Sequence, residues 1–139
     1  MAAVNTFRVS LVTPERAIYE GDARFLVLPA HDGELGVLRD RAPLLVALGA
    51  GTLRIEETGA ERRYFLTGGF AQMVDNRLTV LAEHAEPTEE IDVAAARAEL
   101  EEARAMPSED PRDPRAGERR QEAIACAEAR LKAAGHSGS

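Results

Sequence analysis

The composition of the chain changes near Glu86 and Pro87, and this change restricts the fold more than any other feature of the sequence. Before it, short apolar runs alternate with glycine-containing turns; after it, glycine becomes rare and alanine, glutamate and arginine dominate. The first pattern is typical of β-strands and the second of α-helices. We therefore expect a mainly β member of the α+β class, with a β-sandwich domain over residues 1–86 and a helical region over residues 87–139.

The β-rich part contains many short strand signals. Phe7, Val9 and Leu11 alternate with more polar residues, and this period of two is typical of a half-buried strand. Further runs predict strands at 17–19, 25–28, 44–48, 52–57, 63–66, 70–74 and 78–81. Short strands separated by frequent turns favour an antiparallel sandwich or a flattened barrel over a βαβ fold.

Two helices are expected in the second part. The first covers residues 91–106, with Asp92 as its N-cap because a carboxylate can accept an unpaired backbone N–H. Pro107 ends it, a proline-rich polar linker occupies residues 107–117, and the second helix covers residues 118–133. Their apolar stripes are Val93, Ala96, Leu100 and Ala103, then Ile124, Ala127, Leu131 and Ala134. Alanine gains much less from burial than the roughly 1.5–3 kcal/mol of leucine, so an antiparallel hairpin that is only weakly held is expected.

Bulk properties exclude several kinds of partner. The formal net charge of −7 is opposite to what phosphate-backbone binding requires, so nucleic acid is not expected as a partner. No apolar run is long enough to span a bilayer, so direct membrane insertion is not expected. The single cysteine, Cys126, rules out an intrachain disulfide and is interpreted as a small apolar filler among alanines.

Residues 29–45 form the most distinctive segment, because two glycines, a proline and the carboxylate of Glu34 lie between two apolar runs. We expect a shaped loop that presents Glu34 and Arg41 at one end of the β structure. His31, Asp32 and Glu34 would make an enzyme site only if they converged on a pocket, and the sequence supplies no further group for acid–base chemistry there. A contact surface is therefore favoured, with a small enzyme as an alternative.

Two other motifs have a chemical interpretation and a plainer one. Glu83, His84 and Glu86 suggest a metal site, but no second histidine or cysteine cluster completes it, so a solvated strand end is preferred. Thr67-Gly68-Gly69 lacks the Lys-Ser/Thr end of a phosphate loop, and a bend between strands is preferred.

Several motifs, in order along the chain, resemble the epsilon subunit of F-type ATP synthases. They are Gly33-Glu34-Leu35-Gly36-Val37-Leu38, Ala42-Pro43-Leu44-Leu45, Gly51-Thr52-Leu53-Arg54-Ile55, Gly68-Gly69-Phe70 and Leu78-Thr79-Val80-Leu81-Ala82. The resemblance spans residues 5–105 and includes the two-part layout. It implies a ten-stranded antiparallel β-sandwich followed by an antiparallel two-helix hairpin, and a non-catalytic role in the rotating central stalk.

The resemblance also implies partners and contact residues. In the family, the sandwich joins the gamma subunit and stands on the ring of c subunits, while the hairpin can extend into the alpha/beta catalytic head and oppose ATP hydrolysis. This implies proton-driven ATP synthesis at the cytoplasmic face of a bacterial inner (plasma) membrane. Carried over, the c-ring contact comprises Gly33, Glu34, Leu35, Arg41, Ala42 and Pro43. A free-standing β-sandwich adaptor with a helical protein-binding arm is the main alternative.

The helical region carries the regulatory candidates. Some relatives bind ATP on the folded hairpin through Ile/Leu-Asp-x-x-Arg-Ala; here Ile91 and Asp92 match, but Ala95 replaces the arginine and Arg130 is the remaining candidate cation. No cofactor is therefore expected, and Asp92 is interpreted as a helix cap. The arginines of the regulatory helices interleave with glutamates as in a solvated face, although as a set they suit an acidic partner surface: Arg97, Arg104, Arg119, Arg120 and Arg130.

Overall fold

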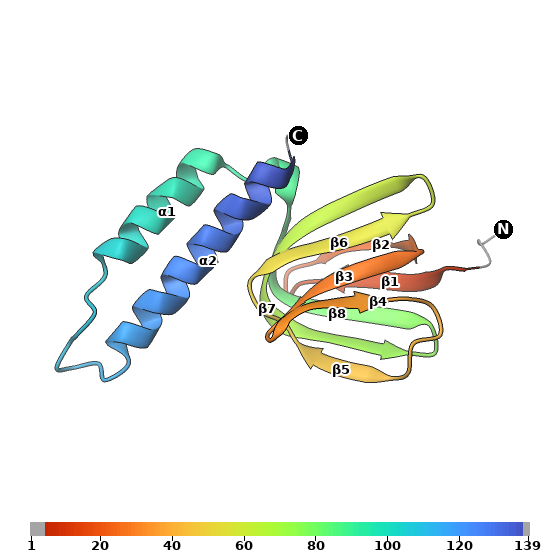
Figure 1. Cartoon of the computed structure of the whole chain (residues 1–139), viewed down its shortest axis with the longest axis horizontal. Helices are drawn as coiled ribbons and strands as arrows, with labels where there is room; N and C mark the ends of the chain where they lie inside the picture. The colour runs from red at the N-terminus through yellow and green to blue at the C-terminus, as the bar shows by residue number, and fades with distance from the viewer. Residues whose placement is uncertain (1–4, 138–139) are drawn as a thin grey trace.

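Strands and helices occupy separate parts of the computed structural model, which describes residues 5–137 (Figure 1). The described strands are β1 Phe7–Val12, β2 Ala17–Ala23, β3 Phe25–Ala30, β4 Gly33–Val37, β5 Leu44–Ala47, β6 Gly51–Glu57, β7 Ala60–Val74 and β8 Arg77–Pro87. The 3₁₀ helix η1 (Thr88–Glu90) links β8 to α1 (Val93–Ala105), and α2 spans Ala116–Ser137. The outer limits expected for the two units, residues 1 and 139, lie outside the described residues.

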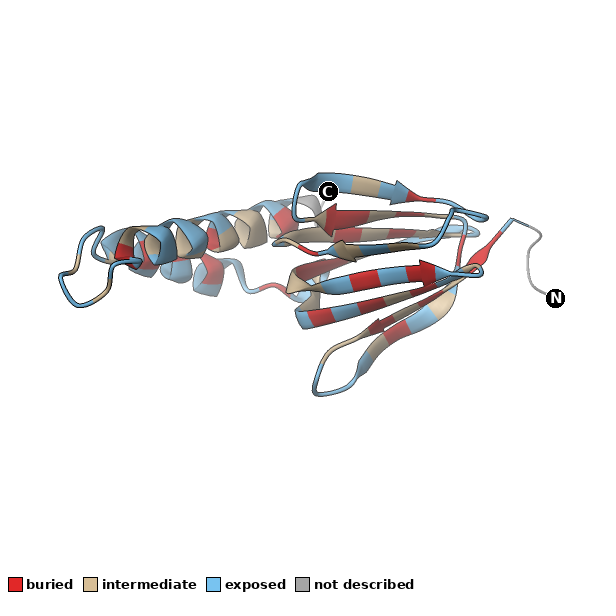
Figure 2. Cartoon of the chain, turned by 90° about the horizontal axis from the view of Figure 1, so that it is seen from below, coloured by how far each residue is buried: buried red, intermediate tan, exposed pale blue. Residues whose placement is uncertain are grey.

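The strands pack as two layers, with the helices at one end (Figure 2). One layer contains β2, β1, the first half of β8, the second half of β7 and β5; the other contains the remaining halves of β8 and β7 with β6, β3 and β4. The ten strand segments that the resemblance implied are therefore present as eight continuous strands, because β7 and β8 run through both layers. The sandwich is confirmed, but the expected purely antiparallel arrangement is wrong in one pair, because β1 and β8 are parallel.

β7 passes between the layers at Gly68 and Gly69, whose φ angles are positive at 64° and 103°. These angles are accessible to glycine and strained for other residues. A Cβ on Gly69 would also collide with the carbonyl oxygen of Leu81 and lie 2.9 Å from the Cα of Ala82 on β8. The glycine pair therefore makes a bend within one strand, not the expected break between two.

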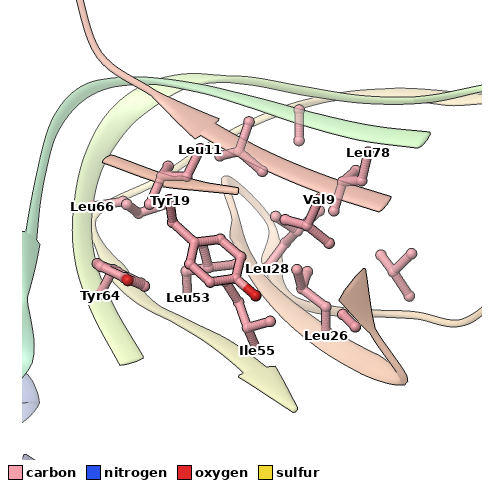
Figure 3. Packing of buried hydrophobic residues seen from close by; sticks show 14 of the residues in the cluster. Val9, Leu11, Tyr19, Leu26, Leu28, Leu53, Ile55, Tyr64, Leu66 and Leu78 are labelled. Atoms are coloured by element: carbon pink, nitrogen blue, oxygen red, sulfur yellow. The ribbon is translucent and has the colours of Figure 1, made fainter. Parts of the chain in front are cut away.

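The main core lies between the two layers and follows the predicted alternation. Phe7, Val9 and Leu11 of β1 are buried, while the residues between them are half-buried. Figure 3 shows how Val9 and Leu11 meet side chains from the opposite layer. Those labelled partners are Leu26 and Leu28 of β3 with Leu53 and Ile55 of β6, all of them buried. The core is mostly aliphatic, as the low aromatic content of 4% requires, although Phe7, Tyr19 and Tyr64 also belong to it.

A polar cluster closes the sandwich where β2 meets β6. The Tyr19 hydroxyl donates a hydrogen bond to Glu57, and Arg62 Nε donates to the other carboxylate oxygen of Glu57 at 2.9 Å. The Arg62 guanidinium also lies 5.6 Å from the centroid of the Tyr19 ring. The hydrogen bond from Tyr19 holds the pKa of Glu57 below its usual range, while burial and the Glu57 carboxylate raise the pKa of Tyr19.

Glu57→Gln is expected to destabilise the protein near pH 7 by about 1.5–3 kcal/mol, because hydrogen bonds to a charged acceptor are lost. The folded-state pKa of Glu57 is lowered, so its contribution is present above the unfolded pKa and disappears as the pH falls through the folded pKa. Urea unfolding at pH 7 and pH 3 should therefore show a larger difference between wild type and variant at the higher pH. Glu56→Gln, a charge change on the opposite face of β6, is the control; an equal loss in it would contradict the assignment.

The helices form an antiparallel pair that reaches the sandwich through α2 (Figure 1). As predicted, Asp92 caps α1: its carboxylate accepts a hydrogen bond from the Ala95 N–H at 3.1 Å. α2 is longer than expected at both ends. Neither of these two helices is long and apolar enough to cross a membrane.

A small second cluster joins α2 to the sandwich. Phe65 of β7 is fully buried and packs with Ile91, Ala96 and Ala133. Cys126 is partly buried against the same cluster, and burial raises the pKa of its thiol, consistent with an apolar filler.

Candidate interaction surfaces

The distinctive segment 29–45 is not a single loop. Residues 33–37 form β4, which pairs antiparallel with β3, so Glu34 lies near the start of this strand and Arg41 lies beyond its end. A strand of this length spans roughly 16 Å, at about 3.3 Å per residue. The expectation that Glu34 and Arg41 share one end of the β structure is therefore wrong. β4 is the edge strand of its layer, so the two residues lie at different points along one edge.

The end of the sandwich that lies far from the helices is fixed by an unusual polar contact. Asn76 in the β7–β8 turn accepts a hydrogen bond from the Asp40 N–H at 2.6 Å, and its amide donates to the Asp40 carboxylate at 3.0 Å. Both residues have positive φ, 65° for Asp40 and 60° for Asn76. This pair holds the β4–β5 loop, which contains Arg41, Ala42 and Pro43, against the neighbouring turn.

The side chains proposed for an enzyme site do not converge. His31 and Asp32 lie 3.6 Å apart, but their side chains are 79% and 102% exposed. Glu34 faces a cleft to which neither of them contributes. This geometry gives the enzyme alternative no acid–base site.

The suggested metal ligands are also used differently. His84 Nε2 lies 3.9 Å from the Glu86 carboxylate, and Glu86 is bound by an arginine. Within residues 5–137, no group of three or more histidine, cysteine, aspartate or glutamate side chains is arranged to hold a metal ion.

The two ATP candidates on the hairpin already have partners within the chain. The Asp92 carboxylate is the α1 cap described above. Arg130 of α2 donates from Nε to Glu86 of β8 at 2.7 Å and from Nη1 to Glu99 of α1 at 2.6 Å. The Arg130 and Glu86 side chains are only 15% and 19% exposed, and hydrogen bonding to Glu86 raises the pKa of Arg130. This ion triad, Arg130 with Glu86 and Glu99, joins both helices to the sandwich.

Among the described residues, the contacts of the other helix arginines lie within the helical region and do not join it to the sandwich. Arg120 donates to the Arg104 carbonyl at 3.3 Å, which joins α2 to the end of α1. Arg119 pairs with Asp113 at 2.9 Å just before α2, and Arg97 is exposed on α1. The predicted solvated face describes these residues well, but Arg130 differs from them because it is half-buried in the ion triad.

An exposed apolar patch covers the outer face of the layer that ends in β5. Leu45, Phe70 and Leu81 are 71%, 56% and 52% exposed. They are neighbours on that face, because Phe70 pairs directly with Leu81 across β7 and β8 and Leu45 pairs with Gln72, two residues further along. We call Leu45, Phe70 and Leu81 the β5–β8 patch. Large exposed apolar side chains clustered on one face mark a protein interface.

Comparison with known proteins identifies the family. The model of the ATP synthase delta/epsilon chain β-sandwich domain matches residues 6–88, more than half of the chain. The chain belongs to this family. Like other epsilon chains, it is therefore a non-catalytic subunit of ATP synthase, a membrane-associated complex.

Individual relatives agree with this assignment. The ATP synthase epsilon chain of Pelotomaculum thermopropionicum is 48% identical over 93 residues, which are 67% of this chain and 69% of that protein. The epsilon chain of Syntrophomonas wolfei is 45% identical over 102 residues, 73% of this chain and 74% of that protein.

Solved structures resemble the chain over nearly its whole length. A chain from the Euglena gracilis mitochondrial ATP synthase, in a structure of OSCP, F1 and the c-ring, has a TM-score of 0.80 and 30% identity; the match covers 94% of this chain and 82% of that one. A chain from the central stalk and c-ring structure of the Tetrahymena thermophila mitochondrial ATP synthase has a TM-score of 0.63, with coverage of 91% and 95%; at 18% identity it supports the fold alone.

Sequence reasoning missed the two most informative features of this epsilon-family chain. The β5–β8 patch combines residues from three strands, and only the cross-strand register brings them together. The ion triad joins three elements, and no local pattern in the sequence links Glu86 and Glu99 to Arg130. A signal for the patch was available, because Phe70 and Leu81 are large apolar residues at positions that alternate with buried ones.

Proposed function

We propose that this epsilon-family chain is a rotor subunit of the central stalk that couples the gamma subunit to the c-ring during proton-driven ATP synthesis. The β5–β8 patch carries the proposal, since a non-catalytic subunit with a rigid sandwich needs a surface by which torque is transmitted. In this proposal the patch docks on gamma. The complex would lie at the cytoplasmic face of a bacterial plasma membrane, with this chain peripheral to the bilayer.

The proposed c-ring contact runs along the β4 edge. That edge begins with Gly33, Glu34 and Leu35 and is followed along the chain by Arg41, Ala42 and Pro43. An extended contact can therefore include all six residues, whereas a contact at a single loop tip cannot. The Asp40–Asn76 hydrogen bonds support this role, because they stiffen the loop that would bear on the ring.

The helical hairpin is the proposed regulatory arm. In this proposal residues 87–139 move as a unit relative to the sandwich of residues 1–86, and the extended arm contacts the alpha/beta catalytic head and opposes ATP hydrolysis. The small apolar cluster around Phe65 and the ion triad support a docked state that is stable but reversible.

Leu81→Glu is expected to weaken binding to purified gamma subunit by about 30-fold or more, because a charge replaces an apolar contact in the patch and a contact that becomes buried in an interface is worth roughly 2 kcal/mol or more. The measurement is surface plasmon resonance with the full chain. Leu38→Glu is the matched control, since Leu38 is exposed to a similar extent, 58% against 52%, but lies outside the patch. Equal effects of the two variants would contradict the gamma interface.

Co-purification separates the adaptor alternative from the rotor function. A rotor subunit should co-purify with gamma and the catalytic head subunits from membranes. Isolation of the wild-type chain without them, under conditions that preserve the assembled ATP synthase, would instead favour a free-standing adaptor.

A further inference from the structure

Two charges of opposite sign lie on β8 at either end of the β5–β8 patch. Arg77, Leu81 and Glu83 are exposed and stand two or four positions apart on this strand, so their side chains point outward from the same face. Leu81 belongs to the patch, and the two charges therefore flank it. Six positions of β8 separate them, which is roughly 20 Å at about 3.3 Å per residue.

The backbone of β7 determines where the Glu83 carboxylate lies. A Cβ on Gly68 would come within 2.6 Å of a carboxylate oxygen of Glu83, so this carboxylate occupies the space that the glycine leaves open. Phe70 pairs with Leu81, two residues before Glu83, which places the carboxylate next to the patch at its helical end. A carboxylate near an exposed aromatic ring suits a basic side chain, which can pair with the acid and lie over the ring.

Arg77 lies at the opposite end of the same row. It follows the β7–β8 turn and pairs with Val74 of β7, whose side chain is 41% exposed. Its other neighbour, Arg8 of β1, is held by Glu20 and Asp22, with each carboxylate 3.4 Å from the guanidinium group. The charges on the β1–β2 side of this face therefore compensate one another within the chain.

No such compensation exists for the two charges that flank the patch. Within residues 5–137, the side chains of Arg77 and Glu83 make no ion pair and no hydrogen bond. Charges at the rim of an interface influence which surface can dock there and in which register, because unlike charges attract and like charges repel. A positive group at one end and a negative group at the other give the patch a direction.

We propose that Arg77 and Glu83 orient the partner that docks on the β5–β8 patch. The matching surface carries an acidic side chain opposite Arg77, a basic side chain opposite Glu83 and an apolar area between them. A partner turned end for end would bring like charges together at both ends, and this repulsion opposes the reversed orientation. The inference rests on the proposed function, in which the gamma subunit occupies the patch, and it adds the residues that fix the orientation of gamma.

Exchanging the two charges tests this arrangement without changing the net charge of the chain. We expect the double variant Arg77→Glu, Glu83→Arg to bind purified gamma subunit about 100-fold more weakly in surface plasmon resonance, because two attractions become two repulsions. Arg77→Gln and Glu83→Gln each lose one attraction and should weaken binding about tenfold. The matched control exchanges an exposed pair on α1, Glu101→Arg with Arg104→Glu, and should leave the affinity unchanged.

The ionic strength gives a second measurement. Raising the salt concentration should slow association of gamma with the wild-type chain more than with the doubly neutral variant Arg77→Gln, Glu83→Gln, because salt screens the charges that only the wild type retains. Equal salt dependence of the two chains would contradict the orienting role.

The outcomes also separate this inference from the proposed gamma interface. If Leu81→Glu weakens binding while the exchanged variant keeps wild-type affinity, gamma occupies the patch and the orienting role is wrong. Equal weakening by the α1 exchange would likewise overturn it, and failure of gamma to bind the wild-type chain would overturn both proposals. Glu83→Gln preserves the shape of the side chain beside Gly68, so its affinity decides the question if a melting curve shows that the exchanged variant unfolds.

Discussion

Gly69→Ala is expected to lower the free energy of unfolding by more than about 3 kcal/mol. Two costs combine at this position. A side chain at φ 103° is strained, and its Cβ would collide with the Leu81 carbonyl oxygen on the paired strand. The neighbour cannot yield easily, because it is backbone in the β7–β8 ladder.

Gly59→Ala separates these two costs. Gly59 also has positive φ, 83°, but a Cβ there would meet nothing within 4 Å. Its replacement should cost only about 1 kcal/mol, the conformational penalty alone. Urea unfolding of both variants measures the difference directly. Equal losses would show that β7 and β8 separate to accommodate the side chain, and that the bend does not require glycine at position 69.

The helix cap and the first strand were predictable because their signals are local. Asp92 precedes an alanine-rich run without β-branched interruption after Val93, and a cap needs only the next three residues to act. The burial of Phe7, Val9 and Leu11 follows from alternation within one strand. Both predictions are confirmed because no distant partner decides them.

β4 was missed because its own sequence carries almost no strand signal. Two of its residues are glycines, and Val37 is the only fully buried member. The backbone pairing with β3 makes it a strand, and that pairing follows from the turn at His31 and Asp32 and not from an apolar pattern. If residues 29–45 are taken as one loop, Glu34 and Arg41 are expected at the same end of the β structure.

Two strands that are longer than predicted have the same explanation as β4, because pairing with a neighbouring strand sets their length. β2 continues to Ala23 although Glu20, Gly21 and Asp22 are typical of a turn, because each pairs with β1. β8 continues to Pro87 beside the first half of β7. The parallel pairing of β1 with β8 joins residues about seventy positions apart, and no local pattern specifies it.

Loss of the ion triad is expected to release the arm without unfolding the sandwich. Arg130→Met keeps much of the apolar stem but removes the charge-assisted hydrogen bonds to Glu86 and Glu99. The bond to the largely buried Glu86 contributes about 1.5–3 kcal/mol, whereas the bond to Glu99, whose side chain is 51% exposed, contributes little because solvent screens it. Docking of α2 should therefore weaken by roughly 2 kcal/mol. The small apolar cluster around Phe65 remains as a contact between α2 and the sandwich.

Hydrogen exchange locates this effect. Amides of α1 and α2 should exchange about 30-fold faster in Arg130→Met, as a change of roughly 2 kcal/mol requires, while amides of β1, β3 and β6 keep their wild-type rates. Arg97→Met is the matched control, because it removes an arginine from the exposed face of α1. If both variants exchange alike, the apolar cluster alone holds the arm.

The rate of ATP hydrolysis by the assembled complex tests whether the arm regulates it. If the extended arm opposes hydrolysis, Arg130→Met shifts the population toward the extended form and lowers the rate, whereas deletion of residues 88–139 removes the arm and raises it. The two changes thus have opposite signs, which general damage to the subunit does not produce. Changes in the same direction would show that the docked arm, and not its release, affects the catalytic head.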